Sequence, residues 1–454
     1  MTADVSTLVA ALPPDTVLTD PDLIEGYRHD WARDPAAGHP LAVVRATCTE
    51  DVQTVLRWAT TQAVPVVPRG AGSGLSGGAS AVDGGIVLAL ERMREIRIDP
   101  AMRVAVAQPG AINIDVKKAA AEHGLWYPPD PSSYEMCSIG GNTATNAGGL
   151  CCVKYGVTTD YVLGLQVVLA DGTAVRLGGP RLKDVAGLSL TKLFVGSEGT
   201  LGVITEVTLR LLPAQPVAAT LVATFDSIEQ AAEAVLGIVS QTRPSMLELM
   251  DRTSVNAVED MCAMGLNRAA AALLIARSDA PGAAAGAEIT IMEKACVRAG
   301  ASELFTTADP GEGEAFAAAR RVAFQALERK GELLFEDVGV PLPALPALVH
   351  GVEEIAARHR TTIALVAHAG DGNTHPLIVF DAGDPDASAR AQLAFADIMV
   401  LATNLDGTIT GEHGVGRLKR AWLPGYLGPE AMALNHRIKQ ALDPSGILNP
   451  GAVL

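Results

Sequence analysis

Val-Pro-Val-Val-Pro-Arg-Gly-Ala-Gly-Ser-Gly-Leu-Ser-Gly-Gly, residues 64–78, is the stretch of the chain that is most informative about the fold. It contains Gly72-x-Gly74-x-x-Gly77, which is the spacing of a Rossmann dinucleotide-binding loop. A Rossmann loop opens a helix, whereas this loop is followed by Ala-Ser-Ala-Val-Asp-Gly-Gly and another apolar strand pattern. The sequence therefore favours a loop whose own backbone N–H groups bind an anion such as a pyrophosphate, and a glycine-rich surface turn is the alternative.

Two further glycine-dense elements favour the binding loop. Ile-Gly-Gly-Asn-Thr-Ala-Thr-Asn-Ala-Gly-Gly, residues 139–149, lies between a proline-rich run at 128–131 and a Lys-Tyr-Gly run at 154–156. Phe-Val-Gly-Ser-Glu-Gly-Thr-Leu-Gly-Val-Ile-Thr, residues 194–205, is expected to add a strand and a turn beside it. Small residues and hydroxyls are poor core material but allow the backbone to approach a large planar ligand closely. We therefore expect these elements to form one binding wall.

The spacing of the apolar runs predicts an α+β fold in three parts. Residues 1–214 alternate helices with short strands, which we expect at 41–45, 65–68, 86–90, 104–108, 163–169 and 203–211. Residues 215–405 are rich in alanine helices, including one at 313–329, and the pattern is typical of a ferredoxin-like domain that caps a substrate. The strands expected there are residues 219–225, 270–277, 333–340 and 362–367. Residues 406–454 form a C-terminal segment with a helix at 432–442.

Two short runs carry the side chains most suited to chemistry. Ala-His-Ala-Gly-Asp-Gly-Asn-Thr-His, residues 367–375, follows an apolar strand pattern, and Gly-Glu-His-Gly stands at 411–414. Imidazole and carboxylate are common metal ligands, so His368, His375 and Glu412 are predicted to bind a divalent metal. His413, beside the glutamate, is then free to act as a base. The alternative is that these histidines are ordinary hydrogen-bonding groups of the interior.

Composition excludes several classes of function. The 454-residue chain is 48% hydrophobic with a formal net charge of −16, which disfavours nucleic acid or an anionic membrane as partner. No signal-peptide pattern or apolar run of about 18 residues is present, so we expect a cytoplasmic protein. The six cysteines include no Cys-x-x-Cys pair, which argues against an iron–sulfur cluster or structural zinc within the chain. Any such cluster for onward electron transfer belongs to a partner.

The order of these motifs resembles a known family. The glycine elements, the His-Ala-Gly-Asp-Gly-Asn-x-His run, Gly-Glu-His-Gly-Val-Gly and the terminal Asp-Pro-x-Gly-x-Leu-Asn-Pro-Gly are similar to those of the FAD-linked D-2-hydroxy acid dehydrogenases of the vanillyl-alcohol-oxidase superfamily. The resemblance covers roughly residues 35 to 451. It implies a two-part FAD-binding domain of that type, a ferredoxin-like substrate domain with the metal site, and a C-terminal segment that returns to the flavin.

The resemblance also implies roles for individual residues. It gives His413 as catalytic base, and Arg320 as the group that binds the substrate carboxylate, with the neighbouring Arg321 as the other possible register. Covalent relatives often carry a histidine in the first loop where this chain has Ser73, so noncovalent FAD is implied. The residues implied to contact FAD come from the glycine elements, their flanks and the tail: Pro68, Arg69, Gly70, Ala71, Gly72, Ser73, Gly74, Pro129, Gly140, Gly141, Thr143, Thr145, Asn146, Ala147, Gly149, Tyr155, Gly156, Glu198, Gly199, Gly202, Val203, Ile204 and Asn449.

Departures from the family pattern bear on the substrate. Members specialised for 2-hydroxyglutarate carry a Lys near Phe335 and an Asn near Leu377, both suited to a second carboxylate. Their absence, and the His375-Pro376 dipeptide, favour D-lactate, glycolate or another small or apolar-tailed acid. The family's terminal Lys is replaced by Ala452, which leaves any role of that Lys in doubt.

Other interpretations of the sequence stay open. D-2-hydroxyglutarate could still be the substrate, bound by another basic residue of the cap domain. A second alternative is a noncatalytic flavin subunit that relays electrons, although such a subunit needs no base or metal. A third is a metal hydrolase without flavin, although it leaves the glycine loops without a role. The metal (Zn, Mn or Fe), the electron acceptor (a quinone, a flavoprotein, an iron–sulfur partner or oxygen) and the oligomeric state, a homodimer included, are not determined by the sequence.

Overall fold

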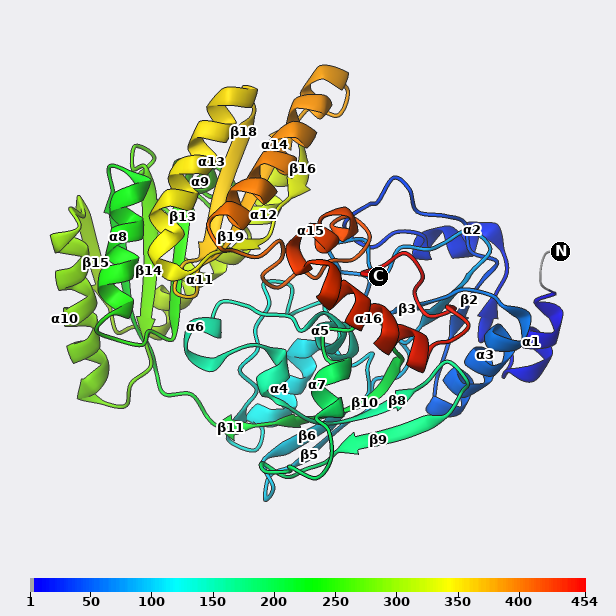
Figure 1. Ribbon diagram of the computed structural model, residues 1–454. Coiled ribbons are helices and arrows are strands. Elements are labelled where there is room, and N and C mark those ends of the chain that lie inside the picture. The colour runs from blue at the N-terminus through cyan, green and yellow to red at the C-terminus, as the bar shows by residue number, and fades with distance from the viewer. Residues whose placement is uncertain (1–3) are drawn as a thin grey trace.

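The computed structural model describes residues 4–454, whose three main sheets form two groups (Figure 1). The eight-stranded sheet with its helices lies on one side of the molecule, and the two smaller sheets lie on the other. No described helix has both the length and the apolar surface required to cross a bilayer. The predicted α+β fold is confirmed.

The first group contains a four-stranded and a five-stranded sheet. In the four-stranded sheet the order is β1 (Val17–Leu18), β2 (Ala42–Arg45), β4 (Ile86–Ala89), β3 (Val66–Arg69). In the five-stranded, antiparallel sheet it is β5 (Ile96–Asp99), β6 (Val104–Ala107), β10 (Val203–Arg210), β8 (Val162–Val168), β9 (Ala174–Gly178). A separate pair joins β7 (Leu125–Trp126) to β11 (Leu212–Pro213). The six strands expected in this part of the chain are all present.

The helices of this group are short apart from one. They are α1 (Ser6–Ala11), α2 (Pro21–Ile24), α3 (Thr49–Gln62), α4 (Asn113–Ala121), α5 (Ile139–Thr145), α6 (Cys152–Tyr155) and α7 (Leu190–Phe194). Strands β2, β4 and β3 are parallel, so the chain needs α3 to cross over from β2 to β3. The parallel strands end at the same edge, and the first glycine loop leaves β3 there.

The eight-stranded sheet is antiparallel throughout and carries helices on both faces. Its order is β15 (Glu303–Thr307), β12 (Ala219–Phe225), β14 (Ala272–Ser278), β13 (Met246–Asp251), β18 (Thr362–His368), β19 (Asn373–Phe380), β16 (Glu332–Phe335), with β17 (Val338–Gly339) also on β19. One face packs on α8 (Ile228–Val239), α10 (Ala283–Arg298), α13 (Leu345–His359) and α14 (Pro385–Asn404). The other packs on α9 (Arg252–Cys262), α11 (Pro310–Arg321) and α12 (Ala323–Glu328).

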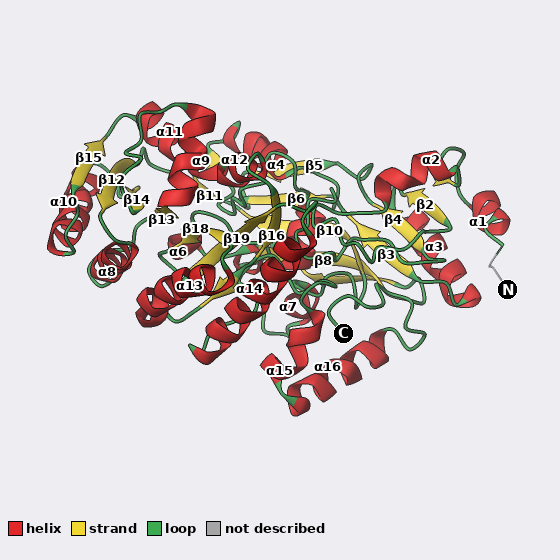
Figure 2. Ribbon diagram, turned by 90° about the horizontal axis from the view of Figure 1, so that it is seen from above, coloured by secondary structure: helices red, strands yellow, loops and turns green. Residues whose placement is uncertain are grey.

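Local sequence explains these helices. Ser227 caps α8 by accepting a hydrogen bond from the backbone N–H of Gln230, and the helix then buries Ile228, Ala231, Ala232, Val235 and Ile238 against the sheet. Ile228, Ala232 and Val235 follow one another at spacings of four and three residues, so one stripe of the helix faces the core. Figure 2 shows the helices mainly at the outside of the molecule, with the strands between them.

Two expected elements differ from the structure. The helix expected at 313–329 is two helices, α11 and α12, which meet at Val322. The strand expected at 333–340 is interrupted at Glu336 and Asp337, whose side chains are fully buried. Strands β13, β15 and β19 were not expected. Whether residues 1–214, 215–405 and 406–454 fold as separate units stays a prediction.

The C-terminal segment returns to the first group of sheets. After α15 (Leu423–Leu427) and α16 (Pro429–Leu442), Leu448 forms a parallel β-bridge with Val66. Ile447 and Leu448 are buried in the core around β3 and β4. Strand β3, from which the first glycine loop leaves, is therefore paired with β4 and also with the C-terminal segment.

Candidate active site

The three glycine elements line one cavity, as the sequence predicts. Sixteen of the residues implied to contact FAD are in its wall: Pro68, Arg69, Gly70, Ala71, Gly72, Ser73, Gly74, Gly140, Gly141, Thr145, Ala147, Glu198, Gly199, Gly202, Val203 and Ile204. Ser138 caps α5 by accepting from the N–H of Gly141, which brings the second element beside the first. The wall is mostly backbone and small side chains, which suits a large planar ligand.

Close packing explains several glycines. A Cβ on Gly140 would overlap Pro109, and a Cβ on Gly148 would overlap the carboxylate of Glu412. Gly72 and Gly199 also have positive φ angles, 75° and 72°, which glycine adopts without strain. This cradle fits a flavin cofactor, because any side chain here would fill the space or displace its neighbours.

Six other residues implied to contact FAD lie outside the cavity wall: Pro129, Thr143, Asn146, Gly149, Tyr155 and Gly156. Their contacts are structural. The Thr143 hydroxyl donates to the Ile139 carbonyl, Asn146 ends α5 in the left-handed conformation, and the Tyr155 hydroxyl donates to Asp279. For these six, the structure supports a role in holding the loops and gives no direct contact with the cavity.

Asn449 also lies outside the wall but ties it together. Its Nδ2 donates to the backbone oxygens of Gly78 and Glu198, at 2.8 Å each. The carboxylate of Glu198 in turn accepts the N–H groups of Val415 and Gly416 at 2.8 and 2.9 Å. Burial raises the pKa of Glu198 to about 7. The tail thus joins two glycine elements, and Glu198 joins them to the loop that carries Glu412.

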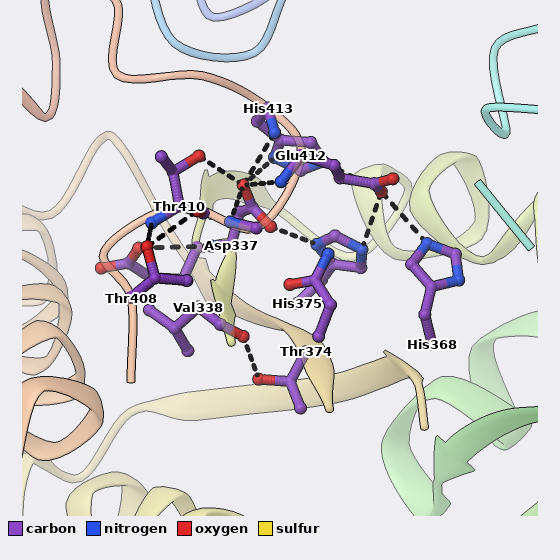
Figure 3. Close-up of polar contacts among 12 residues, drawn as sticks. Asp337, Val338, His368, Thr374, His375, Thr408, Thr410, Glu412 and His413 are labelled. Atoms are coloured by element: carbon purple, nitrogen blue, oxygen red, sulfur yellow. Dashed lines mark hydrogen bonds and ion pairs between the residues drawn. The ribbon is translucent and has the colours of Figure 1, made fainter. Parts of the chain in front are cut away.

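The predicted metal ligands converge in the structure (Figure 3). Oε1 of Glu412 lies 3.1 Å from Nε2 of His368 and 3.2 Å from Nε2 of His375. His368 ends β18 and His375 lies on the adjacent β19. Burial alone would raise the pKa of Glu412, but the two histidines outweigh it and hold that pKa well below its usual value. An ionised carboxylate and two imidazole nitrogens facing one point fit a divalent cation such as Zn, Mn or Fe(II).

His413 lies beside this cluster and opens on the flavin cavity. Its ring stacks on that of His375 with centroids 4.7 Å apart, and its Nε2 is 3.9 Å from Oε1 of Glu412. Burial lowers the pKa of His413 to about 4, so the ring is neutral at pH 7. Both Glu412 and His413 line the same cavity as the glycine elements.

The two candidate arginines occupy different surroundings. Arg320 is fully buried, with Nε 2.9 Å from Oε2 of Glu248, and its guanidinium nitrogens lack a well-oriented hydrogen-bond acceptor within residues 4–454. Arg321 lines the cavity, pairs with Glu314 at 2.6 Å and lies over the Tyr134 ring. Arg320 is thus paired with Glu248 in the interior, and of the two arginines only Arg321 is part of the cavity wall.

Several residues of the site were not anticipated from the sequence. Oε1 of Glu248 lies 2.9 Å from Nδ1 of His368, and Asp337 contacts the loop that carries Glu412 and His413. The segment from α12 to β16 contributes four more cavity residues: Phe324, Gln325, Glu328 and Phe335. The sequence held one sign that Asp337 belongs to the site: Glu336 and Asp337 interrupt an apolar strand pattern, and a buried acid needs a partner.

Comparison with known proteins agrees with this geometry. The family described as FAD linked oxidases, C-terminal domain, matches residues 214–453, and an FAD binding domain matches residues 40–178. Glycolate oxidase subunit GlcD of Bacillus subtilis (strain 168) is 41% identical over 415 residues, which are 91% of this chain and 88% of that protein. D-lactate dehydrogenase of Archaeoglobus fulgidus is 33% identical, over 99% of this chain and 98% of that protein. D-2-hydroxyglutarate dehydrogenase of Xanthomonas citri pv. viticola is 34% identical, covering 98% and 95%.

Solved structures show the same fold at low identity. Substrate-bound p-cresol methylhydroxylase superposes with a TM-score of 0.84 at 20% identity, over 99% of this chain and 96% of that one. A 4-ethylphenol oxidase from Gulosibacter chungangensis superposes with a TM-score of 0.81 at 19% identity, over 99% and 96%.

Proposed function

This chain belongs to the family of FAD-linked oxidases, and from that premise we propose that it oxidises a small D-2-hydroxy acid, of the D-lactate or glycolate type, to the 2-oxo acid. The observation that carries the proposal is that Glu412 and His413 open on the cavity formed by the three glycine elements. An oxidisable C–H bond and its hydroxyl can thereby face a flavin and a base at the same time.

Each polar group then has one task. His413 accepts the proton of the substrate hydroxyl, and the Arg320–Arg321 pair, of which Arg321 lines the cavity, supplies the guanidinium that binds the carboxylate. His368, His375 and Glu412 hold the divalent cation, and the glycine elements hold FAD noncovalently, with Ser73 in the first loop. When bound, the cation lowers the pKa of the substrate hydroxyl and FAD supplies the hydride acceptor.

The cap side of the cavity favours a small substrate. Phe324 and Phe335 both line it, with ring centroids 5.8 Å apart, and Leu377 is fully buried opposite Phe335 in the strand register. These apolar side chains give a second carboxylate no partner at their own positions, and burying an unpaired charge against them costs roughly several kcal/mol. D-2-hydroxyglutarate, the substrate named for one relative, is therefore the second candidate.

An anaerobic visible spectrum of the purified protein tests the proposal. D-lactate, L-lactate, glycolate and D-2-hydroxyglutarate are added in separate cuvettes, and bleaching of the oxidised-flavin band by D-lactate or glycolate is expected. Bleaching by D-2-hydroxyglutarate alone would move the protein to the dicarboxylate branch. A flavin band that no acid bleaches would favour a noncatalytic electron-transfer subunit. Remixing the bleached protein with oxygen or a quinone then identifies the class of acceptor.

A further inference from the structure

One buried carboxylate oxygen anchors the loop that carries Glu412 and His413. Asp337 is fully buried, and its Oδ2 accepts four hydrogen bonds. The donors are the Thr410 hydroxyl at 2.7 Å and the N–H groups of Gly411, Glu412 and His413 at 3.0, 3.0 and 2.8 Å (Figure 3). This loop has no regular secondary structure, so its shape depends on that oxygen.

The other oxygen of Asp337 faces His375. Oδ1 lies 3.7 Å from Nδ1 of His375, and within residues 4–454 neither atom has a hydrogen-bond partner. Both atoms are buried, so leaving them unpaired costs about 1–3 kcal/mol. A carboxylate can only accept, so the two atoms can pair only when His375 carries its proton on Nδ1.

The position of that proton decides what His375 can bind. With the proton on Nδ1, the lone pair of Nε2 points toward Glu412, whose Oε1 is 3.2 Å away. With the proton on Nε2, the same nitrogen is a donor and cannot ligate a cation. Glu248 plays the matching part for His368, with its Oε1 2.9 Å from Nδ1 of that ring.

We propose that Asp337 is a positioning residue with two separable tasks: Oδ2 fixes the loop that carries Glu412 and His413, and Oδ1 fixes the tautomer of His375 that binds a divalent cation. The inference rests on the proposed function, because it concerns the cation that His368, His375 and Glu412 are proposed to hold. It assigns a role to a residue outside the His368, His375 and Glu412 set.

Asp337→Asn separates the two tasks. Four donors surround Oδ2, so the amide oxygen of Asn stays there and the loop keeps its anchor. The amide NH₂ then takes the place of Oδ1 and donates to Nδ1 of His375, which moves the proton of that ring to Nε2. Thr410→Val is the matched control, because it removes one donor from Oδ2 and leaves Oδ1 unchanged.

The experiment measures cation affinity of the FAD-loaded protein by competition of Zn²⁺ or Mn²⁺ with a chelator, together with flavin content and melting temperature. We expect Asp337→Asn to lose about 10- to 100-fold in affinity with its flavin content retained, and Thr410→Val to stay within about twofold of wild type. If Asp337→Asn keeps the wild-type cation affinity, or if both variants lose cation affinity equally, the inference is wrong but the proposed function stands. A wild-type protein that binds neither cation overturns the proposed metal site as well.

A second measurement applies if Asp337→Asn does not fold. ¹⁵N spectra of histidine-labelled, cation-free wild-type protein report the tautomer of each ring, and His375→Gln assigns the signal. A proton on Nδ1 of His375 supports the inference, and a proton on Nε2 overturns it.

Discussion

The two walls of the cavity are built from opposite materials. The wall formed by the three glycine elements is mainly backbone and glycine, and we expect it to accept FAD by leaving space. The opposing, charged wall presents Glu412 and His413 to the cavity, and behind them lie the buried side chains of Glu248, Asp337, His368 and His375. Substitutions that add side-chain atoms should therefore impair the first wall, and substitutions that remove side-chain atoms should impair the second.

Removing the proposed base should have the largest effect. We expect His413→Ala to lower kcat by about 10²- to 10⁴-fold, since general-base catalysis contributes that much. Flavin content should stay at the wild-type level because His413 belongs to the charged wall. Steady-state kinetics and the visible spectrum check both points, and His359→Ala, which removes a histidine paired with Asp397 far along the chain, is the control. Unchanged turnover in His413→Ala would exclude it as the base.

One glycine tests whether the two walls are truly distinct. Gly148 belongs to the second glycine element, but a Cβ there would overlap Oε2 of Glu412. We expect Gly148→Ala to weaken Zn²⁺ or Mn²⁺ binding by about 10- to 100-fold while FAD remains bound, because the methyl group displaces a proposed ligand. Gly141→Ala adds the same methyl 3.1 Å from Ser138 and should leave cation affinity unchanged. Equal affinities in the two variants would contradict this assignment.

Removing the tie between the glycine elements should have the smallest effect. Asn449→Ala loses three side-chain hydrogen bonds, two donated to Gly78 and Glu198 and one accepted from Arg417, each worth about 0.5–1.5 kcal/mol. We expect FAD affinity to fall about tenfold, with kcat at saturating FAD nearly unchanged. Titration of the apoprotein with FAD measures this. Asn435→Ala, whose amide contacts only its own helix at Ala431, is the control, and an equal loss there would refute a specific role for Asn449.

The sequence predicts what is encoded locally. The glycine elements and the His-His-Glu set are short runs, so their presence could be recognised before the structure was known. Glu248 and Asp337 could not be assigned, because Glu248 lies 120 residues before His368 and only the pairing of β13 with β18 brings them together. The strand β19 was missed because it begins with polar residues and contains Pro376.

Local sequence also does not determine the contacts of the C-terminal tail or of the two arginines. The family resemblance placed Asn449 near the flavin, but only the structure shows that it contacts loop backbone and not the cavity. Arg320 and Arg321 are adjacent in sequence, yet the end of α11 sends one into the interior and the other to the cavity wall. Which way each side chain points depends on packing against β13, and a local pattern does not contain that information.

The parallel bridge between Val66 and Leu448 sets an order of events during synthesis. Asn449 and the Gly78 carbonyl that it binds are 371 residues apart, so a ribosome needs roughly 20 to 75 s to make the residues between them. During that interval the first glycine loop exists without its tie. The nascent chain can therefore complete this tie only late in translation, after the C-terminal segment has emerged from the exit tunnel.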